Sequence, residues 1–218
     1  NTVIASPIAL NYTIQKVYNH DTSAYTQGLE WHNNKLIEGT GLRGKSVLYQ
    51  MDDQLSPFGK QVNLEPSYFG EGITIMDDLI YQLTWQKGKC FTYKIYEDHI
   101  QLDGEFNYAG QEGWGLCNNG TSLIMSDGTE RITFRNPESF QVERVIDVYN
   151  DKGPIVAMNE LEFIDGKIYA NVYQTNVVVA IDPETGKILE EIDYTTNLLN
   201  NTKSNKIKSL DYLNVLTT

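Results

Sequence analysis

The chain has 218 residues, of which 40% are hydrophobic and 21% are charged, and its formal net charge is −12. This apolar content can build a folded core, and the lack of charge blocks and low-complexity tracts excludes a disordered chain. The negative charge argues against nucleic acid and anionic membranes as partners, because both would repel the protein, and no apolar run is long enough to cross a bilayer. We therefore expect a single domain over residues 1–218 that binds neither nucleic acid nor membrane.

The first predicted element is a strand over residues 12–18, a stretch rich in Tyr, Thr, Ile and Val. Four segments that resemble one another follow, and each opens a repeat. They span residues 27–31, 71–75, 114–118 and 159–163. Their second positions fall at residues 28, 72, 115 and 160, so successive repeats are 44, 43 and 45 residues apart. Periods of this length are typical of propeller architectures.

Turn residues recur in phase with this repeat. A first set follows the opening apolar run each time, at residues 33–34, 77–78, 118–120 and 165–166. A second set lies at residues 52–53, 97–98, 136–138 and 182–186. Both sets are rich in Asn, Asp and Gly, which tolerate the positive φ of hairpin turns. Alternating runs such as 79–83 and 167–173 lie between them, which gives four short strands per repeat.

The sequence thus predicts an all-β fold, a five-bladed β-propeller with four-stranded antiparallel blades, because 218 residues divided by a 44-residue repeat gives close to five. We expect both termini to close the last blade, which could be shortened, with strands at residues 12–18 and 211–216. A helix is conceivable only around residues 195–204. The alternative, a β-sandwich with coincidental spacing, is disfavoured by two sets of turns in register.

One rim of the central channel is the expected place for a site. The first strand of a propeller blade lines the axis and the second returns beside it, so the start of one and the end of the other meet at the same rim. The first repeat position holds Gln27, Glu71, Trp114 and Asn159. Three further aromatic residues should join them, namely Tyr25, Trp85 and Tyr173. One carboxylate, two amides and four aromatic rings predict a binding pocket with apolar walls and few polar groups.

Each of these residues also has a structural explanation. Glu71 could be a solvated loop acid, the tryptophans could pack between blades, and the amides could bind loop backbone. A functional role is favoured because equivalent repeat positions carry different residues, whereas structural positions should repeat. If Glu71 lies among tryptophans, the loss of water should raise its pKa, so that it could donate and recover a proton in one cycle.

The sequence offers no recognisable metal site. Three histidines fall at dissimilar repeat positions without a zinc motif: His20, His32 and His99. Cys90 and Cys117 also lack metal-type spacing, and we interpret them as small buried hydrophobes while leaving their pairing open. The segment that begins with Ser126-Asp127 could be mistaken for a nucleophile loop, but no histidine stands at a corresponding rim position, so we interpret it as a turn.

Six segments occur in an order and at a spacing that are specific for one known family. They are Tyr-Thr-Gln-Gly-Leu-Glu at 25–30 after His20-Asp21, Phe-Gly-Glu-Gly-Ile-Thr at 69–74, Tyr-Gln-Leu-Thr-Trp at 81–85, Glu-Gly-Trp-Gly-Leu at 112–116, Met-Ser-Asp-Gly-Thr at 125–129, and Asn-Glu-Leu-Glu at 159–162 with Tyr-Ala-Asn-Val-Tyr at 169–173. In these segments the chain resembles the plant- and bacterial-type glutaminyl cyclases, also called glutamine cyclotransferases. The resemblance runs from about His20 to Gly186, which is most of the chain.

The resemblance implies a five-bladed propeller and a glutaminyl-peptide cyclotransferase, which turns the N-terminal glutamine of a peptide or protein into pyroglutamate and releases ammonia. By the same resemblance Glu71 is the general acid/base. The residues that hold the substrate are then Tyr25, Gln27, Trp85, Trp114, Asn159 and Tyr173. The family implies that no metal or other cofactor is needed and that the protein has a secreted or periplasmic location. We also expect the protein to be a monomer.

Two departures from the family pattern stand out. Tyr25 and Tyr173 replace the usual Phe and Trp, which we expect to retune the pocket. The family also carries a lysine in a Thr-Gly-Lys segment after a Leu-Asn-Gly-Ile-Ala strand. Here the given sequence reaches its last residue, Thr218, three residues after the matching residues 213–215, so we expect a shortened last blade without this lysine. Two alternatives therefore stay open, a catalytically weak or inactive propeller that binds peptide N-termini and a metal-dependent sugar or lactone hydrolase. The second is disfavoured because only one axial acid is evident.

Overall fold

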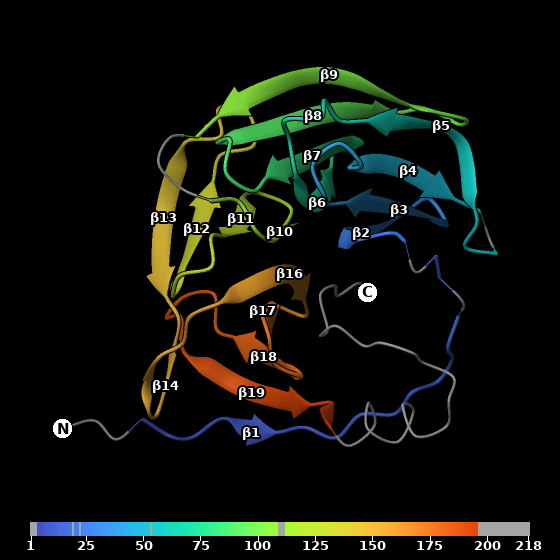
Figure 1. Cartoon of the computed structure of the whole chain (residues 1–218). Helices are drawn as coiled ribbons and strands as arrows, with labels where there is room; N and C mark the ends of the chain where they lie inside the picture. The colour runs from blue at the N-terminus through green and yellow to red at the C-terminus, as the bar shows by residue number, and fades with distance from the viewer. Residues whose placement is uncertain (1–3, 19, 22, 53, 109–111, 196–218) are drawn as a thin grey trace.

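The computed structural model describes residues 4–195 with the exception of 19, 22, 53 and 109–111. Within these residues, four four-stranded antiparallel blades follow one another around a common centre, each with its first strand innermost (Figure 1). The fold is therefore all-β and propeller-like, as the repeat predicts. In the part of the chain that the structure covers, no helix has the length and apolarity to span a membrane.

Each blade corresponds to one repeat of the sequence and contains four strands. The first blade contains β2 (Thr26–His32), β3 (Lys35–Thr40), β4 (Val47–Met51) and β5 (Pro57–Asn63). The second contains β6 (Gly70–Met76), β7 (Leu79–Thr84), β8 (Lys89–Ile95) and β9 (Ile100–Asn107). The third contains β10 (Leu116–Asn118), β11 (Leu123–Ser126), β12 (Arg131–Arg135) and β13 (Val142–Asp147). The fourth contains β16 (Met158–Ile164), β17 (Lys167–Val172), β18 (Val177–Ile181) and β19 (Ile188–Asp193).

Three of the predicted hairpin turns, at residues 33–34, 77–78 and 165–166, are confirmed by the backbone. Residue 53 of the turn predicted at 52–53 lies outside the described residues. Asn33 and Asn34 between β2 and β3 have φ values of 48° and 62°, and Asp77 and Asp78 between β6 and β7 have values of 52° and 60°. The corresponding turn between β16 and β17 includes Asp165 with φ of 48°. Short polar residues at these sites accept a left-handed backbone, and this is why the turns could be identified from the sequence.

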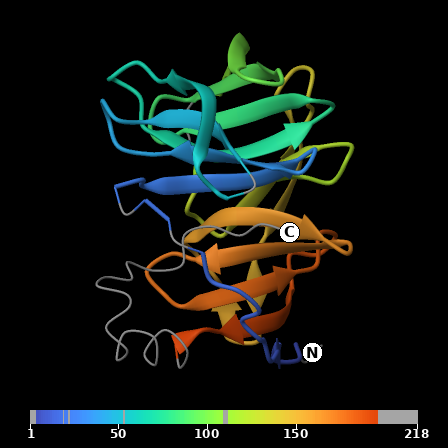
Figure 2. The ribbon, with the colours of Figure 1, turned by 90° about the vertical axis from the view of Figure 1, so that its right-hand side faces the viewer.

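The expectation of five blades is corrected: residues 4–195, apart from the gaps named above, form four. Residues 12–18 form no strand. Instead β1 (Ile8–Ala9) pairs in parallel with β19, so that Ile8 lies opposite Glu190, and the ring of Tyr12 lies 4.3 Å from that of Tyr194. These contacts lay the N-terminal segment along the fourth blade, from where it continues to β2 (Figure 2). The predicted strand at 211–216, and all but the first residue of the conceivable helix at 195–204, lie outside the described residues.

A short hairpin that the sequence did not predict follows the third blade. It consists of β14 (Tyr149–Asn150) and β15 (Gly153–Pro154). The Ile155 N–H donates to the Val148 carbonyl at 2.9 Å, which closes the base of the hairpin. The hairpin thus belongs to the connection between β13 and β16, and it does not begin a further blade.

The hydrophobic core lies between neighbouring blades. Ile37 and Leu48 of the first blade pack against Ile73, Ile80 and Phe91 of the second, and the first four of these side chains are fully buried. Equivalent clusters join the second blade to the third and the third to the fourth. Each blade is therefore stabilised mainly by burial of its faces against its neighbours, because apolar burial is the dominant favourable contribution to folding.

The cysteines belong to these clusters. Cys90 lies in the cluster between the second and third blades, and Cys117 lies between the third and fourth. Both are buried, and neither forms a disulfide. They occupy the role of small hydrophobic residues, which the sequence analysis favoured.

The innermost strands approach one another closely at the second repeat position. A Cβ at Gly72 would lie 2.6 Å from the Leu116 nitrogen, and a Cβ at Gly115 would lie 1.9 Å from the Asn159 carbonyl oxygen. Only glycine allows this approach. The equivalent position in the fourth blade holds Glu160, which is buried and whose N–H donates to Asn171 Oδ1 at 2.8 Å. The glycines thus allow the innermost strands to pack closely beside the first repeat position, where the candidate site lies.

Candidate active site

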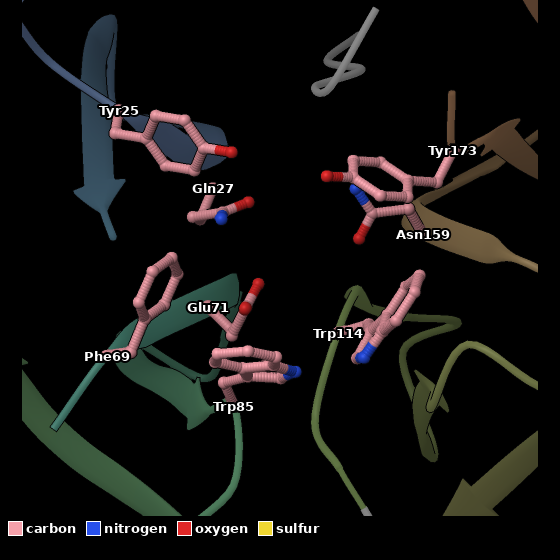
Figure 3. Close-up of a pocket in the computed structure, with 8 residues that line it drawn as sticks. All are labelled: Tyr25, Gln27, Phe69, Glu71, Trp85, Trp114, Asn159 and Tyr173. Atoms are coloured by element: carbon pink, nitrogen blue, oxygen red, sulfur yellow. The ribbon is translucent and has the colours of Figure 1, made fainter. Parts of the chain in front are cut away.

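A pocket of about 190 Å³ opens at the rim where the innermost strands begin. It is lined by Tyr25, Gln27, Phe69, Glu71, Trp85, Trp114, Asn159 and Tyr173 (Figure 3). The structure therefore brings together all seven residues that the sequence singled out, and it adds Phe69. Trp85 directly follows β7 and Tyr173 directly follows β17, so the ends of second strands meet the starts of first strands.

Glu71 is the carboxylic acid of the pocket and lies near the start of β6, with only 6% of its surface exposed. Its side chain points into the pocket beside Trp85 (Figure 3). Burial raises its pKa well above the ordinary value of 4.5, and the charge of Glu112 raises it further. The expected rise of the Glu71 pKa is thereby confirmed. A carboxyl group with a raised pKa can exchange protons near neutral pH.

Aromatic rings form two walls on opposite sides of the pocket (Figure 3). On one side the Tyr25 ring meets Phe69 edge-on at 6.1 Å, and Phe69 meets Trp85 at 5.6 Å. On the other side Trp114 meets Tyr173 edge-on at 5.6 Å. Edge-to-face contacts of this kind hold rings at defined angles. The walls can therefore grip an aliphatic stem and exclude water from it.

Two amides supply the neutral polar groups. Gln27 and Asn159 are 7% and 6% exposed, and both point into the pocket (Figure 3). Each lies at the first repeat position of an innermost strand, so the backbone of that strand fixes the point from which the side chain projects. An amide offers both donors and acceptors, so the pair can bind an amide or the main chain of a ligand.

Ser126 binds backbone groups at or next to two of the residues that line the pocket. Its hydroxyl donates to the Asn159 carbonyl at 2.6 Å and accepts from the Gly115 N–H at 2.8 Å. Ser126 is the last residue of β11, and the turn after it includes Gly128 with φ of 80°. The interpretation of this segment as a turn is confirmed, and the serine hydroxyl is bound on both sides to backbone that holds Trp114 and Asn159 in place.

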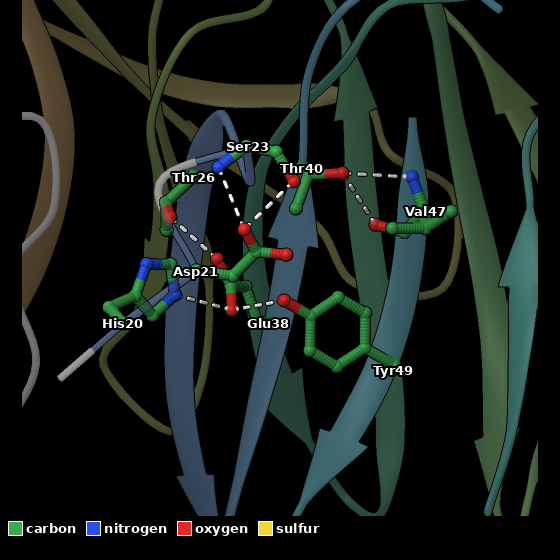
Figure 4. Close-up of polar contacts among 8 residues, drawn as sticks. All are labelled: His20, Asp21, Ser23, Thr26, Glu38, Thr40, Val47 and Tyr49. Atoms are coloured by element: carbon green, nitrogen blue, oxygen red, sulfur yellow. Dashed lines mark hydrogen bonds and ion pairs between the residues drawn. The ribbon is translucent and has the colours of Figure 1, made fainter. Parts of the chain in front are cut away.

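A buried carboxylate anchors the start of β2 between Tyr25 and Gln27. Glu38, with no exposed surface, accepts hydrogen bonds from Thr26 Oγ1 at 2.5 Å, Tyr49 Oη at 2.5 Å and His20 Nε2 at 3.0 Å (Figure 4). Because Thr26 stands between the two lining residues, this network fixes the strand from which both project. Nothing in the sequence around Glu38 distinguishes it from an ordinary strand residue, so its role could not be predicted from the sequence.

Glu112 is a second residue of the site that was not among the predicted site residues. Its Oε2 accepts from the indole N–H of Trp85 at 2.7 Å and from that of Trp114 at 3.0 Å, and its Oε1 accepts from Gln86 Nε2 at 3.1 Å. Burial opposes ionisation of Glu112, but these three hydrogen bonds outweigh it and lower the pKa. Glu112 is therefore a carboxylate at neutral pH.

The repeat contained a signal for both Phe69 and Glu112. Phe69 precedes Glu71 by two residues, as Tyr25 precedes Gln27 and Glu112 precedes Trp114. Tyr25 was singled out at this offset, and applying the same offset to the next two repeats identifies the other two residues. This position therefore lies at the rim in each of these three blades.

No group of three or more His, Cys, Asp or Glu side chains within the described residues is arranged to hold a metal ion. The histidines lie apart and each pairs with a different acid. His32 Nε2 lies 3.2 Å from Asp78, and His99 Nδ1 lies 2.8 Å from Asp98. The pocket itself contributes one carboxylate, from Glu71, with Glu112 behind the indoles.

These observations define a propeller-like protein whose channel mouth holds a small aromatic pocket around a buried carboxylic acid. The chain belongs to the glutamine cyclotransferase family, whose model matches residues 1–217. It is 31% identical over 191 residues to a glutaminyl-peptide cyclotransferase of Arabidopsis thaliana, in a match that covers 84% of this chain and 59% of the relative. The chain thus spans less than two thirds of that relative. Among solved structures it is similar to the glutaminyl cyclase of Myxococcus xanthus, with a TM-score of 0.84 and 30% identity over 97% of this chain and 88% of that chain.

Proposed function

We propose that this protein is a glutaminyl-peptide cyclotransferase that converts an N-terminal glutamine into pyroglutamate and releases ammonia without a metal. The observation that carries the proposal is the pocket itself, in which Glu71 is buried with a raised pKa between two aromatic walls and two amides. Family membership and the similarity to a glutaminyl-peptide cyclotransferase and to a glutaminyl cyclase support the same activity.

The reaction needs folding of the substrate and movement of one proton. The free α-amine attacks the side-chain amide carbon of the same glutamine, a C–N bond forms in a five-membered ring, and the bond to the amide nitrogen breaks. Because the attack is intramolecular, holding the glutamine in the cyclic geometry supplies a large part of the rate enhancement. We assign this task to the aromatic walls, which surround the aliphatic stem, and to Gln27 and Asn159, which bind the amide or the main chain.

Glu71 moves the proton. As a carboxylate it accepts a proton from the attacking amine, and as a carboxylic acid it delivers that proton to the departing nitrogen, which leaves as ammonia. The ring nitrogen loses one hydrogen and the leaving nitrogen gains one, so Glu71 ends the cycle as it began. The raised pKa suits this exchange, because a group poised near the working pH is both a competent base and a competent acid.

The proposal is tested by ammonia release from a short peptide that begins with glutamine, with a glutamate-initiated peptide as control and with each reaction repeated in chelator. Chelator-resistant release from the glutamine peptide alone is the expected result. If the folded protein binds the glutamine peptide but releases no ammonia, the protein is a binding module and the proposal is wrong. If the chelator abolishes release, metal independence is wrong.

We further propose that the protein acts as a monomer and, on family grounds alone, that it is located outside the cytoplasm. Sedimentation of the purified chain checks the first statement, and a concentration-dependent increase in mass contradicts it. Fractionation of the source cells checks the second.

A further inference from the structure

We propose that Glu112 is a positioning residue of this site, whose single carboxylate oxygen binds both indoles of the pocket and so fixes its two aromatic walls relative to each other and to Glu71. We call the two hydrogen bonds from the indoles of Trp85 and Trp114 to Glu112 Oε2 the clamp. Its catalytic consequence rests on the proposed function, whereas its geometry can be tested independently of that function. Nothing in the repeat requires an acid at this position, since the equivalent residues in the first two repeats are Tyr25 and Phe69.

The clamp joins two blades. Trp85 follows β7 of the second blade, and Trp114 precedes β10 of the third, so their rings come from different sheets. Their indole nitrogens point toward each other across the pocket (Figure 3). Both N–H groups end on Oε2 of Glu112, at 2.7 Å and 3.0 Å. An indole N–H donates only one hydrogen bond, so this oxygen determines the rotation of both rings.

The backbone holds Glu112 where it can serve both rings. The Gly113 N–H donates to the Trp85 carbonyl at 3.0 Å, and the Trp114 N–H donates to the Ser126 carbonyl at 3.1 Å. The segment is therefore tied to the second blade on one side and to the third on the other. A Cβ at Gly113 would lie 2.2 Å from Tyr108 Oη and 3.0 Å from the Thr84 carbonyl oxygen, so the chain passes closely over the end of β7.

A carboxylate suits this position better than an amide. Glu112 accepts from three donors, two on Oε2 and one on Oε1. A glutamine here could still present its one oxygen to both indoles, but its NH₂ group would face the NH₂ group of Gln86. The Gln86 amide in turn accepts from Arg43 Nη2 at 3.0 Å, and the Arg43 guanidinium lies 5.4 Å from the centre of the Trp85 ring. Arg43, Gln86 and Glu112 thus form a polar chain from a cation to an anion around Trp85.

The charge of Glu112 acts on Glu71 as well. Burial is the larger cause of the raised Glu71 pKa, and the charge of Glu112 raises this pKa further. The cation of Arg43 is bound to Gln86, which in turn donates to Glu112. Like charges disfavour double ionisation, so an ionised Glu112 keeps the proton on Glu71 to a higher pH. Glu112 therefore orients the two indoles of the pocket and adds to the effect of burial on the Glu71 pKa.

The geometry is tested by NMR of the indole groups. The chain has three tryptophans, so three indole N–H signals are expected, and Trp85→Phe and Trp114→Phe assign them. Glu112→Ala should shift the signals of both Trp85 and Trp114 while the signal of Trp31, which lies on β2 and is 47% exposed, stays in place. If only one signal or neither shifts, one oxygen does not hold both rings and the proposal is wrong.

The catalytic consequence is tested by the pH profile. Glu112→Gln removes the charge but can keep both indole bonds, so it should move the acid limb of kcat/KM to lower pH and leave KM within a few-fold of the original. Glu143→Gln, an exposed acid on β13, changes the net charge equally and should leave the profile unchanged. A Glu112→Gln profile that keeps its acid limb refutes the effect on Glu71. If the unaltered protein releases no ammonia, the proposed function fails, while the NMR result still decides the clamp.

Discussion

The carbonyl oxygen of Asn159 lies only 1.9 Å from the position that a Cβ atom on Gly115 would occupy. The two residues belong to the third and fourth blades, and Ser126 binds both of them through one hydroxyl. Asn159 also lines the pocket. The packing of two innermost strands and the position of a polar group in the site are therefore the same structural feature.

Gly115→Ala should disturb stability and activity together. The new methyl group meets backbone, which cannot turn aside as a side chain could, so overpacking should cost about 1–3 kcal/mol of unfolding free energy. A displacement of Asn159 by an ångström could lower activity roughly a hundredfold. Urea unfolding and ammonia release measure the two effects. Gly104→Ala on β9 is the matched control, since its Cβ would meet only Thr92 Oγ1 at 3.3 Å. Equal effects of the two substitutions would contradict this explanation.

Ser126→Ala should weaken the protein without abolishing turnover. The substitution removes the hydroxyl that accepts from the buried Gly115 N–H and donates to the Asn159 carbonyl, and a buried donor left unsatisfied costs about 1–3 kcal/mol. Activity should fall only as far as Asn159 and Trp114 move. Thermal unfolding and ammonia release at a temperature where the variant is folded are the measurements. Complete loss of activity in a folded variant that still binds the glutamine peptide would show that the hydroxyl takes part in the chemistry.

The sequence predicted the residues of the site more accurately than it predicted the number of blades. Gln27, Glu71, Trp114 and Asn159 share one repeat position and differ from each other, and the structure places all four around one pocket. Their location followed from strand phase, which the hairpin turns at Asn33 and Asp77 fix locally. The next position holds glycine in three repeats, and there the reason is structural, because neighbouring strands nearly touch.

The count of five blades failed because it treated the N-terminal segment as part of a repeat. Division of length by period takes no account of what the terminal segments contact. Residues 12–18 contain strand-forming residues, yet Ile8 and Ala9 pair with β19 instead and Tyr12 packs on Tyr194. Tertiary contacts thus override local preference, as is usual for β propensity. Glu38 was missed for a related reason, since a buried hydrogen-bond network is built from residues that are distant in sequence.

Glu71→Gln should lower kcat by at least about a hundredfold, the usual scale for the loss of a positioned proton-transfer group. The amide keeps the shape of the side chain, so the glutamine peptide should still bind. In the unaltered protein kcat/KM should rise with pH through the raised pKa of Glu71, because the carboxylate starts the reaction. Steady-state kinetics between pH 4 and 9 measure both effects. Activity within a few-fold of the original would remove Glu71 from the mechanism.

Glu30 should make the protein less stable as the pH rises. Burial, followed by the charge of Glu162, raises the pKa of Glu30 from 4.5 to about 8, while a hydrogen bond with Thr74 opposes the rise. Between these two values the folded state binds more protons than the unfolded state, so the free energy of unfolding falls as the pH increases across this interval. The loss is complete above the folded-state pKa and absent below the unfolded-state value. Glu71, whose pKa is also raised, contributes in the same direction.

Glu30→Gln should therefore flatten the dependence of stability on pH. Near pH 9 the variant should be more stable than the original chain by about 2–4 kcal/mol, since one pKa unit corresponds to about 1.4 kcal/mol and partial solvation reduces the full effect. Near pH 4 the two proteins should unfold at similar urea concentrations. Glu143→Gln, with the same change of charge on an exposed strand, should behave like the original chain at both pH values. An equal gain in stability at pH 4 and pH 9 would mean that the benefit comes from packing, because only the ionisation of Glu30 makes it depend on pH.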